Sequence, residues 1–226
     1  CLKAHCSKIK MVKTIIFDWG GVLIENPAHG IVSYCASHLG TDEKTLITAR
    51  NKLFTEFQKG AISEDVFWTE VCNELRLQKP RTSSLWADAF RHAYSPIEEM
   101  FSLASSLNRV NYRICILSNT EKPVLNHLNE PRYAPFNPII TSCIEGFIKP
   151  EQKIYEIALE KTKTIPEETL FIDDKIENLN GAEKLGISTF LEISDIIWAP
   201  ISGILIFIMY RSAIWTAIGI GEELLP

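Results

Sequence analysis

The sequence lacks the paired cysteines that would indicate a zinc site or a disulfide framework. Its six cysteines are scattered along 226 residues and form no CxxC pair, so neither kind of site is indicated. The five histidines do not cluster either. This cysteine usage fits a reducing compartment, and we expect a cytoplasmic protein.

The chain also has no large excess of charge, no internal repeat and no low-complexity segment. The formal net charge is −5, which gives no reason to expect nucleic acid as a partner. Apolar residues make up 46% of the chain and charged residues 23%, which is ordinary for a globular protein. At 226 residues the chain is long enough for one full core and a smaller subdomain.

A secretory signal is missing from the start of the chain. Residues 1–10 contain no apolar h-region. Met11 resembles a natural start. We therefore predict that residues 1–10 are an extension without a role.

The other end of the chain is apolar. Residues 194–226 form a hydrophobic tail, in which 196–210 is a 15-residue stretch without a charge. That stretch is shorter than the roughly 20 residues that a membrane helix needs. The longer window 196–221 would place Arg211 inside the span, at a high free-energy cost. We favour a tail packed on the domain or an atypical terminus; membrane anchoring through residues 196–221 is the alternative.

Short apolar strands alternate with helices on both sides of a long helical block. Strands are expected at 14–17, 113–117, 138–142 and 169–172, and helices at 151–162 and 179–185. Residues 29–107 have apolar residues at helical spacing and no strand-like run. The order predicts an α/β fold, in which a Rossmann-like parallel sheet core (11–28 and 108–193) has an all-helical cap (29–107) inserted after the first strand.

The helical block contains few residues that stand out as substrate contacts. Four of its aromatic residues fall on apolar helix faces and are expected in the core of the cap: Phe67, Trp68, Trp86 and Phe90. Nothing in the sequence marks a lysine of the block as buried, so Schiff-base chemistry is not indicated.

Polar residues follow the predicted strands, at or just beyond the point where each strand ends. They are, in chain order, Asp18, Ser118, Asn119, Lys149, Asp173 and Asp174. Open parallel sheets bind their ligands in a crevice at the carboxyl ends of the strands. If these strands are neighbours in one sheet, all six residues meet in one crevice.

Four segments of the chain resemble a known set of motifs. FDWGGVL, ILSNT, GFIKPEQKIY and FIDDKIENLNGA are similar, in this order, to the four motifs of the haloacid dehalogenase-like hydrolases. The resemblance covers about residues 13–192 and includes the helical insertion, which resembles a C1-type cap. Within the insertion, QKGAISEDVFW is similar to a stretch that is common in such caps.

The resemblance implies that Asp18 is the nucleophile and that Mg²⁺ binds beside it. Three carboxylates brought together would repel one another unless a cation lies between them, and Mg²⁺ favours oxygen ligands of this kind. The family pattern supplies Asp18 and the backbone carbonyl of Gly20. Asp174 is expected to bind the metal directly, and Asp173 directly or through water. Asn178, one helical turn after Asp174, would orient these carboxylates by a hydrogen bond.

The same motifs imply a binding site for a phosphoryl group. The Ser118 hydroxyl, Asn119 and Lys149 would hold its oxygens, and the lysine would also neutralise the nucleophile. Gly20 and Gly21 would let the backbone pass close to the ligand and donate N–H groups to it.

The first motif departs from the commonest phosphatase pattern, in which a second aspartate serves as general acid and base. Gly20 takes its place here, and general acid catalysis typically contributes 10²–10⁴-fold in rate. Glu25 and His29 follow closely enough to substitute, although each is explained more simply as a solvated loop residue. Some family branches with glycine at this position resemble sugar-phosphate phosphatases.

We therefore predict a Mg²⁺-dependent phosphatase that acts on a small phosphorylated metabolite through an aspartyl-phosphate. A metal-independent 2-haloacid dehalogenase is one alternative, because halide expulsion needs no acid; that branch, however, usually lacks the paired Asp173 and Asp174. Another alternative is a protein that keeps the fold with little turnover and serves as a binding or regulatory module. The sequence indicates neither the substrate nor the oligomeric state.

Overall fold

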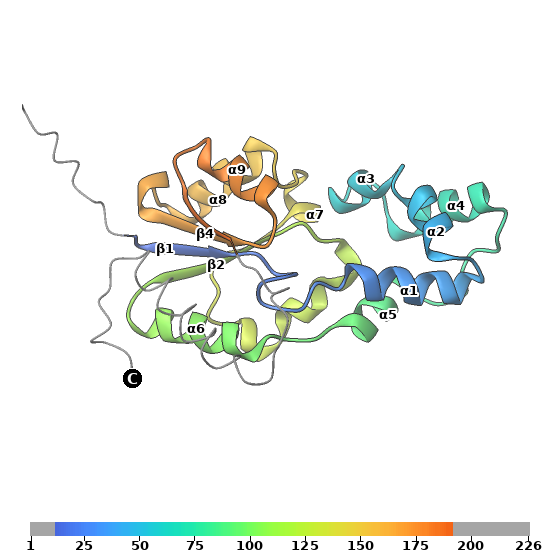
Figure 1. Ribbon diagram of the computed structural model, residues 1–226, viewed down its shortest axis with the longest axis horizontal. Helices are drawn as coiled ribbons and strands as arrows, with labels where there is room; N and C mark the ends of the chain where they lie inside the picture. Colours follow the sequence, from blue (N-terminus) through green and yellow to red (C-terminus); the bar gives the residue numbers. More distant parts are fainter. Residues whose placement is uncertain (1–11, 192–226) are drawn as a thin grey trace, which may run out of the picture.

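A computed structural model describes residues 12–191, and within this range five strands form one parallel sheet (Figure 1). The strands are β1 (Thr14–Phe17), β2 (Arg113–Ser118), β3 (Ile139–Thr141), β4 (Thr169–Asp173) and β5 (Ser188–Leu191). Their order is β3-β2-β1-β4-β5, and all neighbours are parallel. The predicted α/β class is confirmed, with the first strand at the centre of the sheet.

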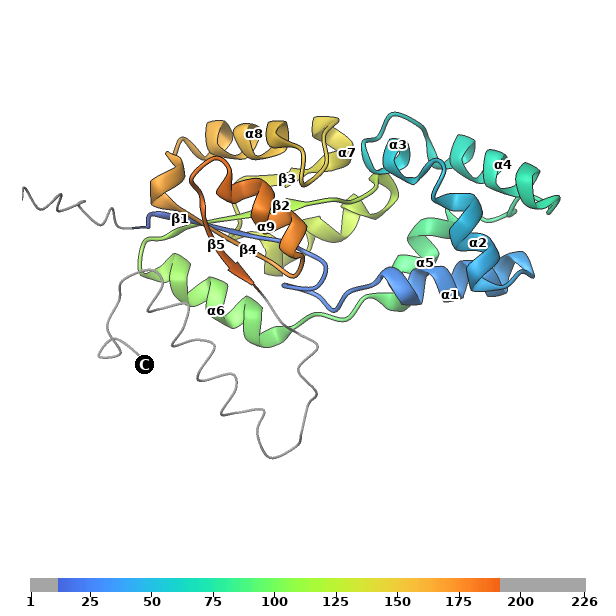
Figure 2. The same ribbon diagram turned by 45° about the horizontal axis from the view of Figure 1, so that its top comes forward.

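The sheet is covered on both faces, which explains the near-continuous apolar runs of its central strands. Successive side chains of a strand point to opposite faces, so Ile15 and Phe17 pack in one cluster and Ile16 in another. The helices α8 (Gln152–Thr162) and α9 (Ile176–Glu183) cover the face of Ile16. Helix α6 (Glu98–Arg109) lies on the opposite face (Figure 2).

Short helical segments connect the strands of the core. They are η1 (Lys122–Asn129), η2 (Pro131–Tyr133), α7 (Ser142–Glu145) and η3 (Pro166–Glu168). Segment η1 is a 3₁₀-helix with Pro123 in its first turn.

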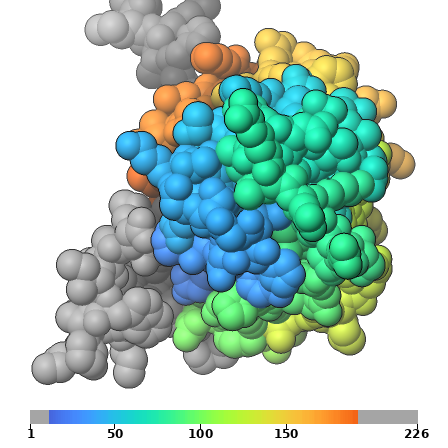
Figure 3. Space-filling model, turned by 90° about the vertical axis from the view of Figure 1, so that its right-hand side faces the viewer, coloured from blue at the N-terminus to red at the C-terminus, as the bar shows by residue number. Residues whose placement is uncertain are grey.

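A helical cap lies beyond the carboxyl end of β1 (Figure 1). It consists of α1 (Ala28–Leu39), α2 (Glu43–Arg50), α3 (Phe54–Gln58), α4 (Glu64–Leu75) and α5 (Leu85–Ala93). Helix α1 packs against α5, and α2 against α4. The four aromatic residues expected in the core of the cap are all buried. When the cap faces the viewer, it lies in front of the core (Figure 3).

The last helix of the predicted cap packs on the core instead. The sequence assigned all of 29–107 to the cap, but α6 packs against β2 on one face of the sheet. Met100, Phe101 and Leu107 of this helix are buried in the same cluster as Ile114 of β2. Helical spacing of apolar residues reveals a buried face but does not identify the element that covers it.

The cap contacts the core through the backbone at residues 58–60. Ser142 Oγ donates to the Gln58 carbonyl at 2.7 Å, and Lys122 Nζ donates to the Gly60 carbonyl at 3.1 Å. Gly60 has φ of +67°, and a Cβ there would lie 2.3 Å from the carbonyl oxygen of Cys143. A glycine is therefore required where the cap approaches the core.

The two chain ends lie outside the described residues. This applies to the predicted extension at residues 1–10 and to the predicted tail at 194–226, including the membrane alternative at 196–221. Among the helices formed by residues 12–191, none combines the length and the apolar character needed to cross a membrane.

Candidate active site

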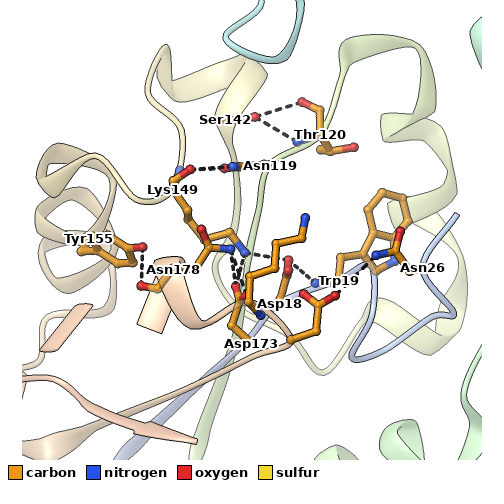
Figure 4. Close-up of polar contacts among 12 residues, drawn as sticks. Asp18, Trp19, Asn26, Asn119, Thr120, Ser142, Lys149, Tyr155, Asp173 and Asn178 are labelled. Atoms are coloured by element: carbon orange, nitrogen blue, oxygen red, sulfur yellow. Dashed lines mark hydrogen bonds and ion pairs between the residues drawn. The ribbon is translucent and has the colours of Figure 1, made fainter. Parts of the chain in front are cut away.

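The carboxyl ends of three adjacent strands bring the predicted site residues together (Figure 4). Strand β1 lies between β2 and β4. Asp18 follows β1, Ser118 ends β2 and Asp173 ends β4. Their exposed fractions are 5%, 4% and 0%, so all three are held away from bulk water. The crevice expected from the strand order is present in the structure.

Lys149 connects two of these carboxylates. Its Nζ lies 2.8 Å from Asp18 Oδ1 and 2.7 Å from Asp173 Oδ2, and its side chain is fully buried. The Asn119 side chain fixes the Lys149 backbone, donating to its carbonyl at 2.9 Å and accepting from its N–H at 2.8 Å. The side chain of Asn119 is thus engaged in positioning the lysine, a contact that the sequence did not reveal.

Asp173 is also held by donors from the start of α9. Asn178 Nδ2 donates to both carboxylate oxygens at 2.9 and 3.1 Å, and the backbone N–H of Lys175 donates to Oδ1 at 2.8 Å. The sequence predicted that Asn178 orients the paired carboxylates from a helical turn away. It contacts Asp173 because the chain turns between the end of β4 and Ile176, where α9 begins.

The three carboxylates form a cluster with the donor set of a Mg²⁺ site. Oxygens of Asp18, Asp173 and Asp174 all lie within 4.8 Å of one another. Asp174 Oδ1 is buried and has no hydrogen-bond partner within the described residues, which is costly in the absence of a cation. Hard oxygen ligands of this kind suit Mg²⁺, and the spare oxygen of Asp174 fits a direct ligand.

Burial dominates the electrostatics of the cluster. It raises the pKa of Asp18 to about 7, opposed by Lys149 and reinforced by the charge of Asp173. Burial alone would raise the pKa of Asp173 as well, but Lys149 and Asn178 hold it below its usual value. Burial alone would lower the pKa of Lys149, but the two carboxylates raise it. Lys149 is therefore a charged lysine at neutral pH.

Two glycines after Asp18 allow the first motif to pass close to the cluster. Gly21 has φ of +91°, and a Cβ there would lie 2.3 Å from Asp174 Oδ2. Its N–H donates to the Ile24 carbonyl at 2.7 Å and is engaged there, contrary to the expectation that it contacts the phosphate. At Gly20 a Cβ would lie 3.2 Å from Cδ of Pro27, so a larger residue requires the proline to shift.

Replacement of Gly21 by alanine should disturb the aspartate cluster and the Mg²⁺ binding expected there. The added methyl group would displace Asp174, and we expect Mg²⁺ affinity and kcat/KM to fall by about 10–100-fold. Gly40→Ala is the matched control, because Gly40 also has positive φ (+69°) but a Cβ there meets nothing within 4 Å. The control should lose about 1 kcal/mol of stability from backbone strain and keep its kcat/KM. If Mg²⁺ titrations gave the same affinity for the two variants, the close approach of Gly21 to Asp174 would not matter for metal binding, and the prediction would be wrong.

The cluster opens into a cleft of about 210 Å³ between the core and the cap. Six of the predicted site residues line it: Asp18, Gly20, Ser118, Asn119, Lys149 and Asn178. The cap side is mainly apolar, with Ile31, Phe54, Trp86 and Phe90. The cleft is also lined by polar residues that the sequence did not single out: Asn26, Arg50, Gln58, Thr120, Glu121 and Lys175.

The residues suggested as a replacement for the missing acid do not reach this cleft. The side chain of His29 is 86% exposed, and its Nε2 lies 3.6 Å from Glu43. Glu25 is exposed as well. Neither residue belongs to the lining of the cleft that the described residues form. The structure therefore brings neither of them to the position that the second aspartate would occupy.

Glu121 is a buried carboxylate at the junction of core and cap. It is 6% exposed, and Trp86 Nε1 donates to its Oε2 at 3.0 Å. Burial raises the pKa of Glu121 to about 7, opposed by polar contacts with Gln58 and Trp86 and by the charge of Arg50. Burial raises the pKa of the Cys143 thiol, and the charge of Glu121 raises it further. In the sequence, the feature that could have pointed to Glu121 as a site residue is its position directly after the motif ILSNT.

Glu121 should make the stability of the protein depend on pH. A carboxyl whose pKa rises from 4.5 to about 7 on folding contributes stability that is fully present below pH 4.5 and is lost as the pH rises through about 7. Glu121→Gln removes this penalty. The variant should match the wild type in urea unfolding at about pH 5 and exceed it by up to about 3 kcal/mol at about pH 8.

The aspartate cluster also titrates in this pH range, but it is present in both the variant and the wild type. Its contribution therefore drops out of the difference in stability between the two proteins. Glu160→Gln serves as the control, because Glu160 is exposed on α8, and its unfolding curves should follow those of the wild type. A Glu121→Gln protein that is less stable than the wild type at the higher pH would contradict the effect assigned to burial.

Comparisons with known proteins agree with this geometry. The model of the haloacid dehalogenase-like hydrolase family matches residues 12–186. A sesquiterpene phosphatase of Aspergillus oryzae is 31% identical over 181 residues, which are 77% of this chain and 87% of that protein. A D-ribitol-5-phosphate phosphatase of Bacteroides thetaiotaomicron is 26% identical over 194 residues, which are 80% of this chain and 91% of that protein.

A solved structure has the same fold. It is a HAD family enzyme of Bacteroides thetaiotaomicron in complex with magnesium and inorganic phosphate, with a TM-score of 0.67 and 23% identity, over 84% of this chain and 98% of that one. The strand order, the aspartate cluster and the family match over most of the chain lead to one assignment. The chain belongs to the haloacid dehalogenase-like hydrolases and is a hydrolase with a helical cap inserted after its first strand.

Proposed function

We propose that the protein is a Mg²⁺-dependent phosphatase that acts on a small phosphorylated metabolite through an aspartyl-phosphate at Asp18. The observation that carries the proposal is the buried Asp174 Oδ1, which has no donor within residues 12–191 and lies in a cluster with Asp18 and Asp173. A metal-independent reaction does not need a third carboxylate with an unsatisfied oxygen. The phosphatases among the relatives, and the magnesium and phosphate of the solved relative, support the same reaction class.

Asp18, Asp174 and the Gly20 carbonyl would hold the ion, with Asp173 directly or through water. When bound, Mg²⁺ supplies positive charge that offsets the repulsion between the carboxylates and the phosphate. Lys149 would add a second positive charge at the nucleophile, and the Ser118 hydroxyl would hold a phosphoryl oxygen.

In the proposed reaction an oxygen of Asp18 attacks phosphorus, and the bond between phosphorus and the leaving oxygen breaks. Water then attacks the phosphorus of the aspartyl-phosphate, which releases inorganic phosphate and restores the carboxylate. Lys149 holds Asp18 in place from 2.8 Å, and Asn119 holds Lys149. The cap limits the access of bulk water to the cleft.

The leaving alkoxide must gain a proton, and Gly20 offers none. We expect water in the cleft to supply it, because Glu25 and His29, the residues that could replace the missing acid, do not line the cleft. Substrates with acidic leaving groups should therefore react readily, which makes p-nitrophenyl phosphate a suitable first probe.

The test is a panel of p-nitrophenyl phosphate, sugar phosphates and 2-haloacids, each assayed with Mg²⁺ and with EDTA. We expect phosphate release that requires Mg²⁺ and no halide release. Halide release in the presence of EDTA would instead identify a dehalogenase. A well-folded protein that turns over none of these compounds would overturn the enzymatic proposal and favour a binding or regulatory module.

A further inference from the structure

The lining of the cleft contains a cation from the cap and a carboxylate from the core. Arg50 ends α2 and Glu121 follows β2, and both line the cleft. Their charges interact, but no hydrogen bond or ion pair joins the two side chains in the described part of the chain. Arg50 Nε is buried and has no hydrogen-bond partner there.

Both groups are fixed by aromatic neighbours from the cap. The guanidinium carbon of Arg50 lies 4.4 Å from the centroid of the Phe54 ring. Glu121 accepts the hydrogen bond from Trp86 Nε1. Phe54 and Trp86 line the cleft too, so the cation of the cap and the carboxylate of the core lie among apolar side chains, with Gln58 as a further polar residue of the lining. Such a small number of placed polar groups in an apolar lining is typical of a specificity site.

A hydroxyl group satisfies this pair, because it donates to a carboxylate and accepts from a guanidinium at the same time. A hydrocarbon chain beside the Arg50 guanidinium and the Glu121 carboxylate would offer neither group a hydrogen-bond partner, which costs free energy. A second phosphate or carboxylate would suit Arg50 but would be repelled by Glu121. The pair therefore selects a neutral, hydroxylated partner.

We propose that Arg50 and Glu121 bind a hydroxyl group of the leaving group, so that the substrate is the phosphate ester of a small polyhydroxylated alcohol, a sugar or a polyol. The inference rests on the proposed phosphatase function, which places the phosphoryl group at Asp18 and the leaving group toward the cap. The cleft volume of about 210 Å³ is below the range of about 300–1,000 Å³ usual for drug-sized ligands, which fits a small leaving group.

The first experiment compares three substrates with the wild-type protein and Mg²⁺: p-nitrophenyl phosphate, a pentitol phosphate and pentyl phosphate. The last two share a carbon skeleton and differ in their hydroxyl groups. We expect kcat/KM for the pentitol phosphate to exceed that for pentyl phosphate by at least about 100-fold, because a site built to bind a hydroxyl rejects the analogue that lacks it. Equal values, or a preference for pentyl phosphate, would overturn the inference.

The second experiment assigns the preference to the two residues. Arg50→Met keeps the aliphatic stem and removes the donors, and Glu121→Gln keeps the shape and removes the charge. For each variant, the loss of kcat/KM on the pentitol phosphate should exceed the loss on p-nitrophenyl phosphate by at least about tenfold. Arg91→Met is the control, because Arg91 is an exposed residue of α5 that pairs with Asp88, and both substrates should be unaffected.

The outcomes separate the inference from the function on which it rests. Equal losses on both substrates would mean that Arg50 and Glu121 only hold the cap, and would overturn the inference while the phosphatase stands. No turnover of p-nitrophenyl phosphate by the folded wild type would instead remove the proposed function, and the inference with it.

Discussion

Replacement of Asp18 by asparagine is expected to abolish turnover, with kcat/KM falling by at least about 10⁴-fold. An amide oxygen is a poor nucleophile toward phosphorus, and the change also removes a charge from the metal cluster. The fold should persist, because asparagine has the size of aspartate and Asp18 lies in the loop beyond β1. Phosphate release from p-nitrophenyl phosphate measures the loss, and circular dichroism confirms that the variant is folded.

Asp65→Asn is the matched control for this change. Asp65 lies in the first turn of α4 with its side chain 76% exposed and pairs with Lys79, so the same substitution there should leave kcat/KM unaltered. Retention of more than about a hundredth of the wild-type rate by Asp18→Asn would show that another group is the nucleophile.

Replacement of Lys149 by methionine is expected to lower stability and activity together. The buried ammonium group lies 2.8 Å from Asp18 and 2.7 Å from Asp173, and its removal leaves two carboxylates without their partner. Breaking a buried ion pair on one side costs about 3–5 kcal/mol. We expect a loss of this size in urea unfolding in the presence of EDTA, and a smaller loss when Mg²⁺ supplies part of the missing charge.

Lys161→Met provides the comparison at the surface. Lys161 pairs with Glu145 at 2.5 Å, but its side chain is 43% exposed, and such pairs are worth about 0–1 kcal/mol. If both lysine variants lost the same small amount of stability, Lys149 would not be the central charge of a buried cluster.

The core of the site was predictable because the carboxyl ends of neighbouring parallel strands lie at the same edge of the sheet. Asp18, Ser118 and Asp173 each stand at the end of an apolar run, and the strand order that joins β1 to both β2 and β4 brings them together. Lys149 was found from its motif. Its two partners, 2.7 and 2.8 Å away, agree with the predicted neutralisation of the nucleophile.

Contacts that depend on loop conformation or on the docking of the cap were not predictable. Asn119 has a polar side chain suited to a phosphate, and only the path of the loop at Lys149 shows that it holds the backbone there. Arg50 and Glu121 lie on different units of the fold, so no periodicity relates them. Helix α6 was assigned to the wrong unit because an amphipathic pattern does not specify its partner.

Glu121 links the stability of the protein to its proposed specificity. A glutamate whose pKa is raised to about 7 by burial weakens the folded state at neutral pH, where glutamine would not. Functional sites are where such costs are usually found. The pair of measurements on Glu121→Gln, higher stability and lower kcat/KM for the hydroxylated substrate, would reveal this trade-off in one variant.

The most direct test of the central claim is to look for the phosphoryl group on Asp18. The enzyme is quenched in acid during turnover of p-nitrophenyl phosphate with Mg²⁺, and its peptides are analysed by mass spectrometry. We expect one acid-stable, hydroxylamine-labile phosphoryl group on the peptide that contains Asp18, absent with EDTA and absent in Asp18→Asn. Steady phosphate release with no phosphoryl group at Asp18, or with the group on another residue, would contradict the account.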